Sequence, residues 1–98
     1  MFAFILTMPH NNAWNGKWTG DGELFARVHP KPRGAKATEK YQNLIGRHRY
    51  DFGDGWVACI EVVEVGTSEG RKMKKQSRGF WGYDWMIDSL LQHGVIQT

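Results

Sequence analysis

RHRYDFGDGWVACIEVVEV, residues 47–65, is the strongest secondary-structure signal in the sequence. Two β-rich runs flank Gly53-Asp54-Gly55, a turn cluster that is typical of a hairpin loop. The second run ends in Ile60 to Val65, which is apolar enough on both faces to lie in the middle of a sheet. The stretch therefore predicts a β-hairpin at the centre of the fold.

The pairing of this hairpin depends on the length of its turn. A two-residue turn at Asp54-Gly55 pairs Gly53 with Trp56. A three-residue turn, with Gly55 in the left-handed conformation, pairs Phe52 with Trp56 instead. The choice matters because a slip of one residue sends every side chain of a strand to the other face.

We favour the three-residue turn because it gathers the large apolar side chains on one face. It also sets His48 opposite Ile60 and places Arg47 opposite Glu61, a favourable cross-strand pair. The side chains expected to face the core are Tyr50, Phe52, Trp56, Ala58 and Ile60.

The length of 98 residues suits one domain, here expected over residues 1–98, with a core that is stable without staples. Five Trp, five Phe and three Tyr are many for this size, so some of them belong to the core. The single Cys59 excludes an internal disulfide and fits a reducing compartment. The four His and this one Cys show no zinc-binding spacing, and we expect no metal or cofactor.

The N-terminal run from Met1 to Met8 is apolar but too short to span a bilayer. It has no basic n-region and no small-residue cleavage site, so it does not resemble a signal peptide. We expect an edge strand or a flexible start over residues 1–12, and a cytoplasmic protein without a membrane partner.

Two further elements precede the hairpin. Residues 24–29 alternate, with Leu24, Ala26 and Val28 on one face, which predicts a half-buried strand. Residues 35–45 carry an apolar stripe at helical spacing that ends at Ile45, and Gly46 is a suitable helix stop.

Two helices are expected after the hairpin. Thr67 or Ser68 can cap a helix that reaches residue 78. Asp84 can cap another over residues 85–93, which Gly94 would end. The predicted fold is a single small α+β domain, an antiparallel sheet with two or three helices packed on one face.

Charge alternates along the chain in three blocks. Residues 31–49 hold six basic residues and one acid, residues 51–69 hold five acids and no base, and residues 71–78 hold five bases and no acid. Clustered basic charge is what phosphates or an acidic protein surface require.

The segment RKMKKQSR, residues 71–78, is the sharpest functional candidate. On a helix that reached residue 78, four of its cations would fall at i, i+3, i+4 and i+7 and form one stripe. Like charges at i, i+4 do not stabilise a helix. The basic stripe is therefore either an ordinary solvated face or a surface that contacts phosphates or an acidic protein. The basic residues predicted to bind are Arg71, Lys74, Lys75 and Arg78, together with Lys36 and Lys40.

Aromatic residues are the second part of the predicted surface. Phe80 and Trp81 follow the basic segment, which suits binding by charge and stacking together. Trp14 and Trp18 flank a tight turn at Asn15-Gly16, and they either close a small core or form an exposed platform.

Catalytic patterns are not recognisable in the sequence. It shows no glycine-rich phosphate loop, no Ser-His-Asp arrangement and no paired-carboxylate motif. In the favoured register His48 points away from Cys59, which then reads as a half-buried thiol rather than a nucleophile. We therefore predict a binding protein without catalytic residues, while a small enzyme with dispersed catalytic residues is an alternative.

The segments NAWNGKW (residues 12–18), FGDGW (52–56) and GYDWMI (82–87) resemble those of small uncharacterised proteins encoded by phages and other mobile elements. The resemblance implies an accessory protein that binds a host complex, such as an inhibitor of a defence system of the anti-CRISPR type. A protein or nucleoprotein complex is thus the expected partner, and a regulatory protein that binds DNA or RNA directly is the alternative.

Overall fold

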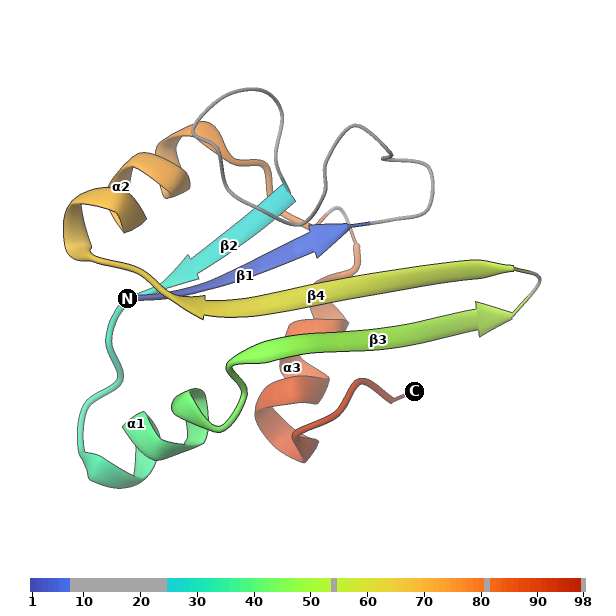
Figure 1. The fold of residues 1–98 in the computed structure, drawn as a ribbon, viewed down its shortest axis with the longest axis horizontal. Helices are drawn as coiled ribbons and strands as arrows, with labels where there is room; N and C mark the ends of the chain where they lie inside the picture. The colour runs from blue at the N-terminus through green and yellow to red at the C-terminus, as the bar shows by residue number, and fades with distance from the viewer. Residues whose placement is uncertain (8–24, 54, 81, 98) are drawn as a thin grey trace.

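The structure is built around a four-stranded antiparallel sheet (Figure 1). It is a computed structural model, and it describes residues 1–7, 25–53, 55–80 and 82–97. In chain order the elements are β1 (Phe2–Thr7), β2 (Phe25–His29), α1 (Ala35–Gln42), β3 (Gly46–Gly53), β4 (Trp56–Glu64), α2 (Thr67–Gln76) and α3 (Asp84–His93). The strands lie in the order β2-β1-β4-β3, and the predicted single α+β domain with an antiparallel sheet is confirmed.

β1 is a central strand that pairs with β2 on one side and with β4 on the other. The prediction of an edge strand or a flexible start is wrong for residues 2–7, while residues 8–12 lie outside the described part of the chain. The physical reason is visible in the sequence, since every residue from Phe2 to Leu6 is apolar and each is at most 2% exposed. A strand that is apolar on both faces is stable where elements pack on both faces of the sheet, and this burial is more complete in the middle of a sheet than at its edge.

The predicted hairpin is present, and its register combines both turn alternatives. Arg47 pairs with Glu61 and Tyr50 with Ala58, as the three-residue turn predicts. Next to the turn, however, Gly53 rather than Phe52 pairs with Trp56, and the register shifts between Asp51 and Gly53. A β-bulge at this point therefore absorbs the one-residue difference.

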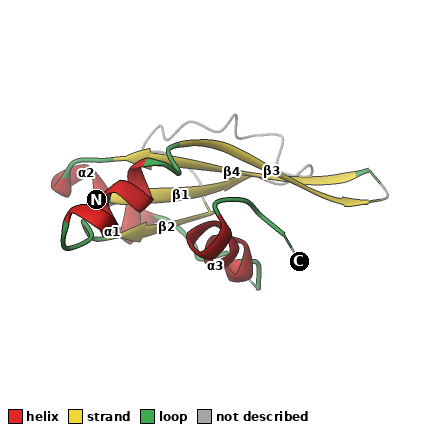
Figure 2. Cartoon of the chain, turned by 90° about the horizontal axis from the view of Figure 1, so that it is seen from below, coloured by secondary structure: helices red, strands yellow, loops and turns green. Residues whose placement is uncertain are grey.

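The predicted core side chains of the hairpin divide by their distance from the turn. Ala58 and Ile60 are fully buried, and Tyr50 is half-buried with its ring centroid 5.2 Å from that of Trp85. Phe52 is 38% exposed, because the hairpin extends past the helices at this end (Figure 2). The side chain of Trp56 lies outside what the structure describes.

The two faces of the sheet are covered by different helices. On one face α1 and α3 enclose the larger core, and the edge-on view of Figure 2 shows α3 below the strands. On the other face Met73 of α2 packs on a smaller cluster of Ala3, Ile5, Ala26 and Val28. The prediction of helices on one face thus holds for α1 and α3, whereas α2 covers the face that β1 and β2 leave apolar.

The chain passes from one face to the other around the outer edge of β2. After α2 the backbone runs beside this strand, where Arg78 forms a parallel bridge with Phe25. The amide of Ala26 donates a hydrogen bond of 2.8 Å to the Arg78 carbonyl. Phe80 then enters the larger core with 0% exposure, and α3 follows on that face.

The ends of α1 and α3 differ in how well the sequence predicts them. α3 ends at Gly94, which adopts the left-handed conformation with φ 76°, as predicted. α1 ends at Gln42, before the predicted Ile45, since the Leu44 amide bonds the Tyr41 carbonyl in a tight final turn. As a result Leu44 is buried and Ile45 is 49% exposed.

Candidate binding surface

The solvent side of α2 carries four basic side chains: Arg71, Lys72, Lys74 and Lys75, all of them exposed. The opposite side of the helix holds its two buried residues, Gly70 and Met73. Because the buried side fixes how the helix is seated, the cations must project away from the sheet. We call these four residues the α2 cations.

Acidic neighbours do not neutralise the α2 cations within the described part of the chain. The ion pairs there join Arg27 to Asp84 and Arg47 to Glu61, each at 3.1 Å. Glu69, in the first turn of α2, forms neither of them. No described acid therefore competes with an external anion for the α2 cations.

Arg78 does not continue the predicted stripe. The prediction of a helix to residue 78 is wrong, because Ser77 is extended with φ −96° and ψ 158° and ends α2 at Gln76. Arg78 is exposed, but it belongs to the segment that bridges to β2. Its position is set by backbone pairing and not by helical spacing from Arg71.

Lys36 and Lys40 lie on α1 and are exposed. Figure 1 shows α1 and α2 at the same end of the sheet, on either side of the N-terminus. α1 packs on the face of the larger core, through Tyr41, whereas α2 packs on the other face. The two groups of lysines therefore do not form one surface.

The structure tests one of the predicted aromatic contacts, that of Phe80. Phe80 is 0% exposed within the larger core, so the prediction that it contacts a partner is wrong. Its ring packs between the sheet and α3. The sequence does not reveal this burial, because a residue in a turn belongs to no helical or strand periodicity that would show which way it faces. Trp14, Trp18 and Trp81 lie outside the described residues, and their predicted contacts stay predictions.

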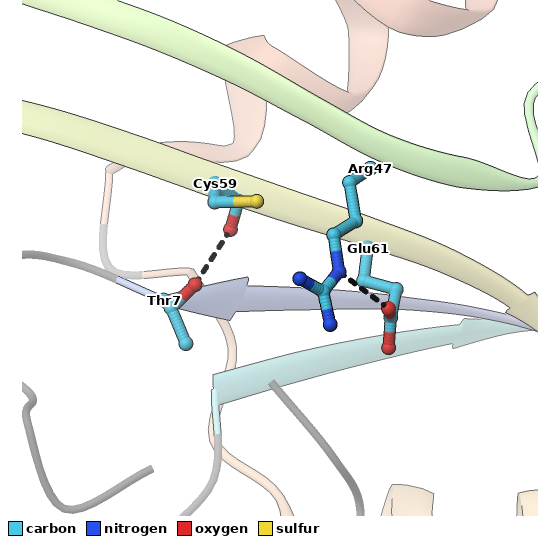
Figure 3. A network of polar contacts seen from close by, with 4 residues as sticks. All are labelled: Thr7, Arg47, Cys59 and Glu61. Atoms are coloured by element: carbon cyan, nitrogen blue, oxygen red, sulfur yellow. Dashed lines mark hydrogen bonds and ion pairs between the residues drawn. The ribbon is translucent and has the colours of Figure 1, made fainter. Parts of the chain in front are cut away.

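Arg47 and Arg49 lie on the same face of the sheet as α2, but on the edge strand β3, at the opposite edge from β2. Val63 packs on the α2 side, so Glu61, two residues earlier on β4, faces the same way. Arg47 Nε donates to Glu61 Oε2 on that face (Figure 3), and strand alternation places the exposed Arg49 beside it. The alternation of Arg47 and Arg49 is visible in the sequence. That they share a face of the sheet with α2 follows only from the strand order.

Lys72 and Arg49 are the residues that the sequence-based site omitted. Lys72 falls outside a stripe of i, i+3, i+4 and i+7, yet the single buried side chain of α2 leaves most of the helix circumference exposed. The narrow buried side was predictable, because Met73 is the only sizeable apolar residue of the segment.

Cys59 lies on this same face of the sheet, and its surroundings do not suggest a nucleophile. Its thiol is half-buried and reduced, and its carbonyl accepts a 3.2 Å hydrogen bond from Thr7 Oγ1 (Figure 3). Its cross-strand neighbour is Arg49 rather than a histidine. Among the described residues, no group of three His, Cys, Asp or Glu side chains could hold a metal ion.

Among the described residues, His29 has a pKa that the fold shifts. Its ring packs on Phe4 with centroids 5.0 Å apart, and its Nδ1 shares a 3.3 Å hydrogen bond with the Tyr41 hydroxyl. Burial, with help from the Arg27 guanidinium, lowers its pKa below the ordinary value of 6.5, and Asp88 opposes this shift. The neutral imidazole therefore serves as part of the core.

Comparison of the chain with protein-family models, with curated proteins and with solved structures finds no significant match in any of the three. In the described part of the chain, no helix is long and apolar enough to cross a membrane.

Proposed function

We propose that this protein is a non-enzymatic binding protein that docks on a macromolecular partner through the α2 cations. The observation that carries the proposal is the exposure of four cations within five consecutive positions, without an acidic partner among the described residues. Arg49 is also exposed on that face of the sheet. The partner is therefore expected to present negative charge.

Helix stability accounts for some of the α2 cations but not for all of them. Lys74 and Lys75 lie in the last turn, where the helix dipole stabilises each cation by about 0.3–1 kcal/mol. Arg71 and Lys72 lie nearer the middle and gain little from the dipole. Arg71 also faces Lys75 at i, i+4, which costs roughly 0.2–0.5 kcal/mol. Helix stability thus explains the two lysines at the end, and binding is the better explanation for Arg71 and Lys72.

An acidic protein surface, alone or within a nucleoprotein complex, is the partner that we favour. Binding of free nucleic acid by charge and base stacking needs exposed aromatic rings, and the buried Phe80 cannot supply one. The net charge of +3 is small for a protein that holds a phosphate backbone by charge alone. Glu64, exposed at the end of β4 close to the start of α2, would also repel such a backbone.

The resemblance to phage and mobile-element proteins suggests the biological class. A small protein with exposed cations on a surface helix can occupy an acidic surface of a host complex that handles nucleic acid. We propose inhibition of such a defence complex, in the manner of anti-CRISPR proteins, in the cytoplasm, where Cys59 stays reduced.

The experiment compares two charge-reversed variants with equal net charge. Arg71→Glu with Lys72→Glu changes the α2 cations, whereas Lys31→Glu with Arg33→Glu changes exposed basic residues outside every predicted binding set. Tagged proteins are used for pull-down from host cells, followed by mass spectrometry, with and without nuclease. We expect a nuclease-resistant complex that the first variant loses and the second retains. Equal capture by both variants would refute docking through α2.

Direct binding to nucleic acid predicts a different result. Four phosphate contacts would give a slope of about −3 in log K against log salt, and neutralising Arg71 and Lys72 would reduce it by about 1.5. Micromolar gel shifts with random DNA or RNA at physiological salt would show that nucleic acid itself is the partner.

A further inference from the structure

Four aromatic rings meet where β3 passes α3, on the face of the sheet opposite the α2 cations. Tyr50 and Phe52 belong to β3, and Tyr83 and Trp85 lie at the start of α3. Ring centroids are 4.8 Å apart for Tyr50 and Phe52, 5.2 Å for Tyr50 and Trp85, and 5.8 Å for Phe52 and Tyr83. The angles between the ring planes are 84°, 84° and 70°, so neighbouring rings stand edge to face. We call these four residues the aromatic patch.

The aromatic patch is only partly covered by the rest of the protein. Tyr50, Tyr83 and Trp85 pack against the larger core but stay half-buried, and Phe52 is 38% exposed. The hairpin extends beyond α3 at this point, as the edge-on view shows (Figure 2). Adjoining apolar surface of this kind is more typical of an interaction site than of scattered exposed residues.

Three polar groups of the aromatic patch have no partner among the described residues: the hydroxyls of Tyr50 and Tyr83 and the indole N–H of Trp85. In the described part of the chain, the buried side-chain polar atom without a hydrogen bond is Oδ1 of the ion-paired Asp84, and not a group of the patch. Solvent therefore reaches all three groups. Each of them can donate a hydrogen bond to a ligand.

This chemistry favours a ligand that combines apolar rings with hydrogen-bond acceptors. The patch has no charged group of its own, and the α2 cations lie on the other face, so it lacks the cations that a phosphate backbone requires. It also has no carboxylate or amide that would accept the hydroxyl protons of a sugar. A polyproline II segment fits, because its backbone carbonyls are free acceptors, its prolines have no N–H, and such segments dock on aromatic side chains.

We propose that the aromatic patch binds a proline-rich segment of a protein partner in the polyproline II conformation. Proline rings would pack against Phe52 and Trp85, and backbone carbonyls would accept hydrogen bonds from the two Tyr hydroxyls and the indole N–H. A polyproline II segment is already ordered before it binds, so binding costs little conformational entropy. The proposal does not depend on docking through α2, because that helix covers the opposite face of the sheet.

The test is an NMR titration of the ¹⁵N-labelled protein with a polyproline peptide of about ten residues. A Gly-Ser peptide of the same length is the control, since it offers carbonyl acceptors without the rings or the ordered conformation. We expect polyproline to shift the indole signal of Trp85 and the amide signals of Tyr50 and Phe52, with a Kd below roughly 1 mM. The Gly-Ser peptide should leave these signals in place. No shift with polyproline, or equal shifts with both peptides, would overturn the proposal.

Variants that remove a hydroxyl and keep its ring separate a binding site from a purely structural cluster. Tyr50→Phe and Tyr83→Phe should each weaken polyproline binding about two- to tenfold, the effect of one lost hydrogen bond. Tyr41→Phe is the matched control and should leave binding unchanged, because its hydroxyl lies on the same face but shares a hydrogen bond with His29.

Three results with these variants and with other probes would contradict the proposal. Equal effects of the three variants would show that the free hydroxyls do not contact the ligand. Tighter binding of oligothymidylate or of a cello-oligosaccharide at the same signals would overturn it in favour of that ligand class. Shifts of these signals on dilution of the protein alone would overturn it in favour of a second copy.

Discussion

Met73→Ala should detach α2 from the sheet while it leaves the larger core intact. Met73 is 0% exposed and packs on β1 and β2, and Gly70 is the only other buried residue of α2. The helix also begins at Gly66 without a side-chain cap. Since one side chain provides most of the attachment, its truncation should act on the whole helix.

The expected cost follows from the burial of this side chain. Replacing a buried Met by Ala destabilises a protein by about 2–5 kcal/mol, from lost transfer energy and the cavity that remains. α2 is an outer layer and can settle towards the sheet, which reduces the cavity. We therefore expect a loss of about 2–3 kcal/mol, with the free energy of exchange of the α2 amides falling furthest.

Hydrogen exchange combined with denaturant unfolding measures both quantities. Met86→Ala is the matched control, because Met86 is also 0% exposed but belongs to α3 and the larger core. It should lower global stability by a comparable amount without selective loss of protection in α2. A loss below about 1 kcal/mol for Met73→Ala, with α2 amides protected as before, would refute the view that this side chain anchors the helix.

Three smaller perturbations test other features. Because the pKa of His29 is lowered in the folded state, its contribution to stability is complete above the unfolded value of 6.5 and is lost as pH falls through the folded pKa. His29→Gln should therefore flatten this part of a plot of unfolding free energy against pH. An unchanged slope would contradict the role of His29. Gly70→Ala should change stability by less than about 1 kcal/mol in urea unfolding, because the helix preference of Ala offsets the shift of the flexible Met1 side chain, whose Sδ would lie 2.5 Å from the new Cβ. A loss above about 2 kcal/mol would show that the Met1 side chain cannot move aside. Gly94→Ala should cost about 1 kcal/mol in the same assay, since φ is 76° there, and a neutral result would mean that the end of α3 rearranges.

Local patterns in the sequence were enough to predict the hairpin, α3 and the strand at residues 25–29. Each of these has a signal within about ten residues: the alternation around Tyr50 and Ala58, the stop at Gly94, and the buried pair that ends at Val28. Such signals depend on the period of the element and not on its neighbours. The predicted cap at Asp84 is wrong, because this residue lies in the first turn of α3 and Tyr83 occupies the N-cap without a side-chain hydrogen bond.

Features that depend on tertiary neighbours could not be predicted in the same way. The central position of β1 requires β4, whose paired residues lie more than fifty positions later. The burial of Phe80 depends on the chain passing around β2 at Arg78. Arg49 shares a face of the sheet with α2 because of the strand order, which the sequence did not predict, so the predicted basic residues did not include it.

The path of the chain around β2 also decides how the sheet meets other strands. An open sheet edge presents unpaired backbone groups that can pair with another chain and lead to aggregation. The backbone of Arg78 occupies part of the β2 edge, whereas β3 forms the other edge and has Arg47, Arg49 and a bulge near its turn. The two arginines therefore protect an edge of the sheet as well as adding exposed charge to one of its faces.

This double role constrains how the surface is mutated. Replacing Arg49 by an apolar residue would remove charge from the edge and invite strand addition, which would be mistaken for altered binding. Arg47 is also unsuited to charge reversal, since Glu61 lies directly opposite. Arg49→Glu faces Cys59 across the strands, and it inverts the charge offered to a partner while keeping the edge protected.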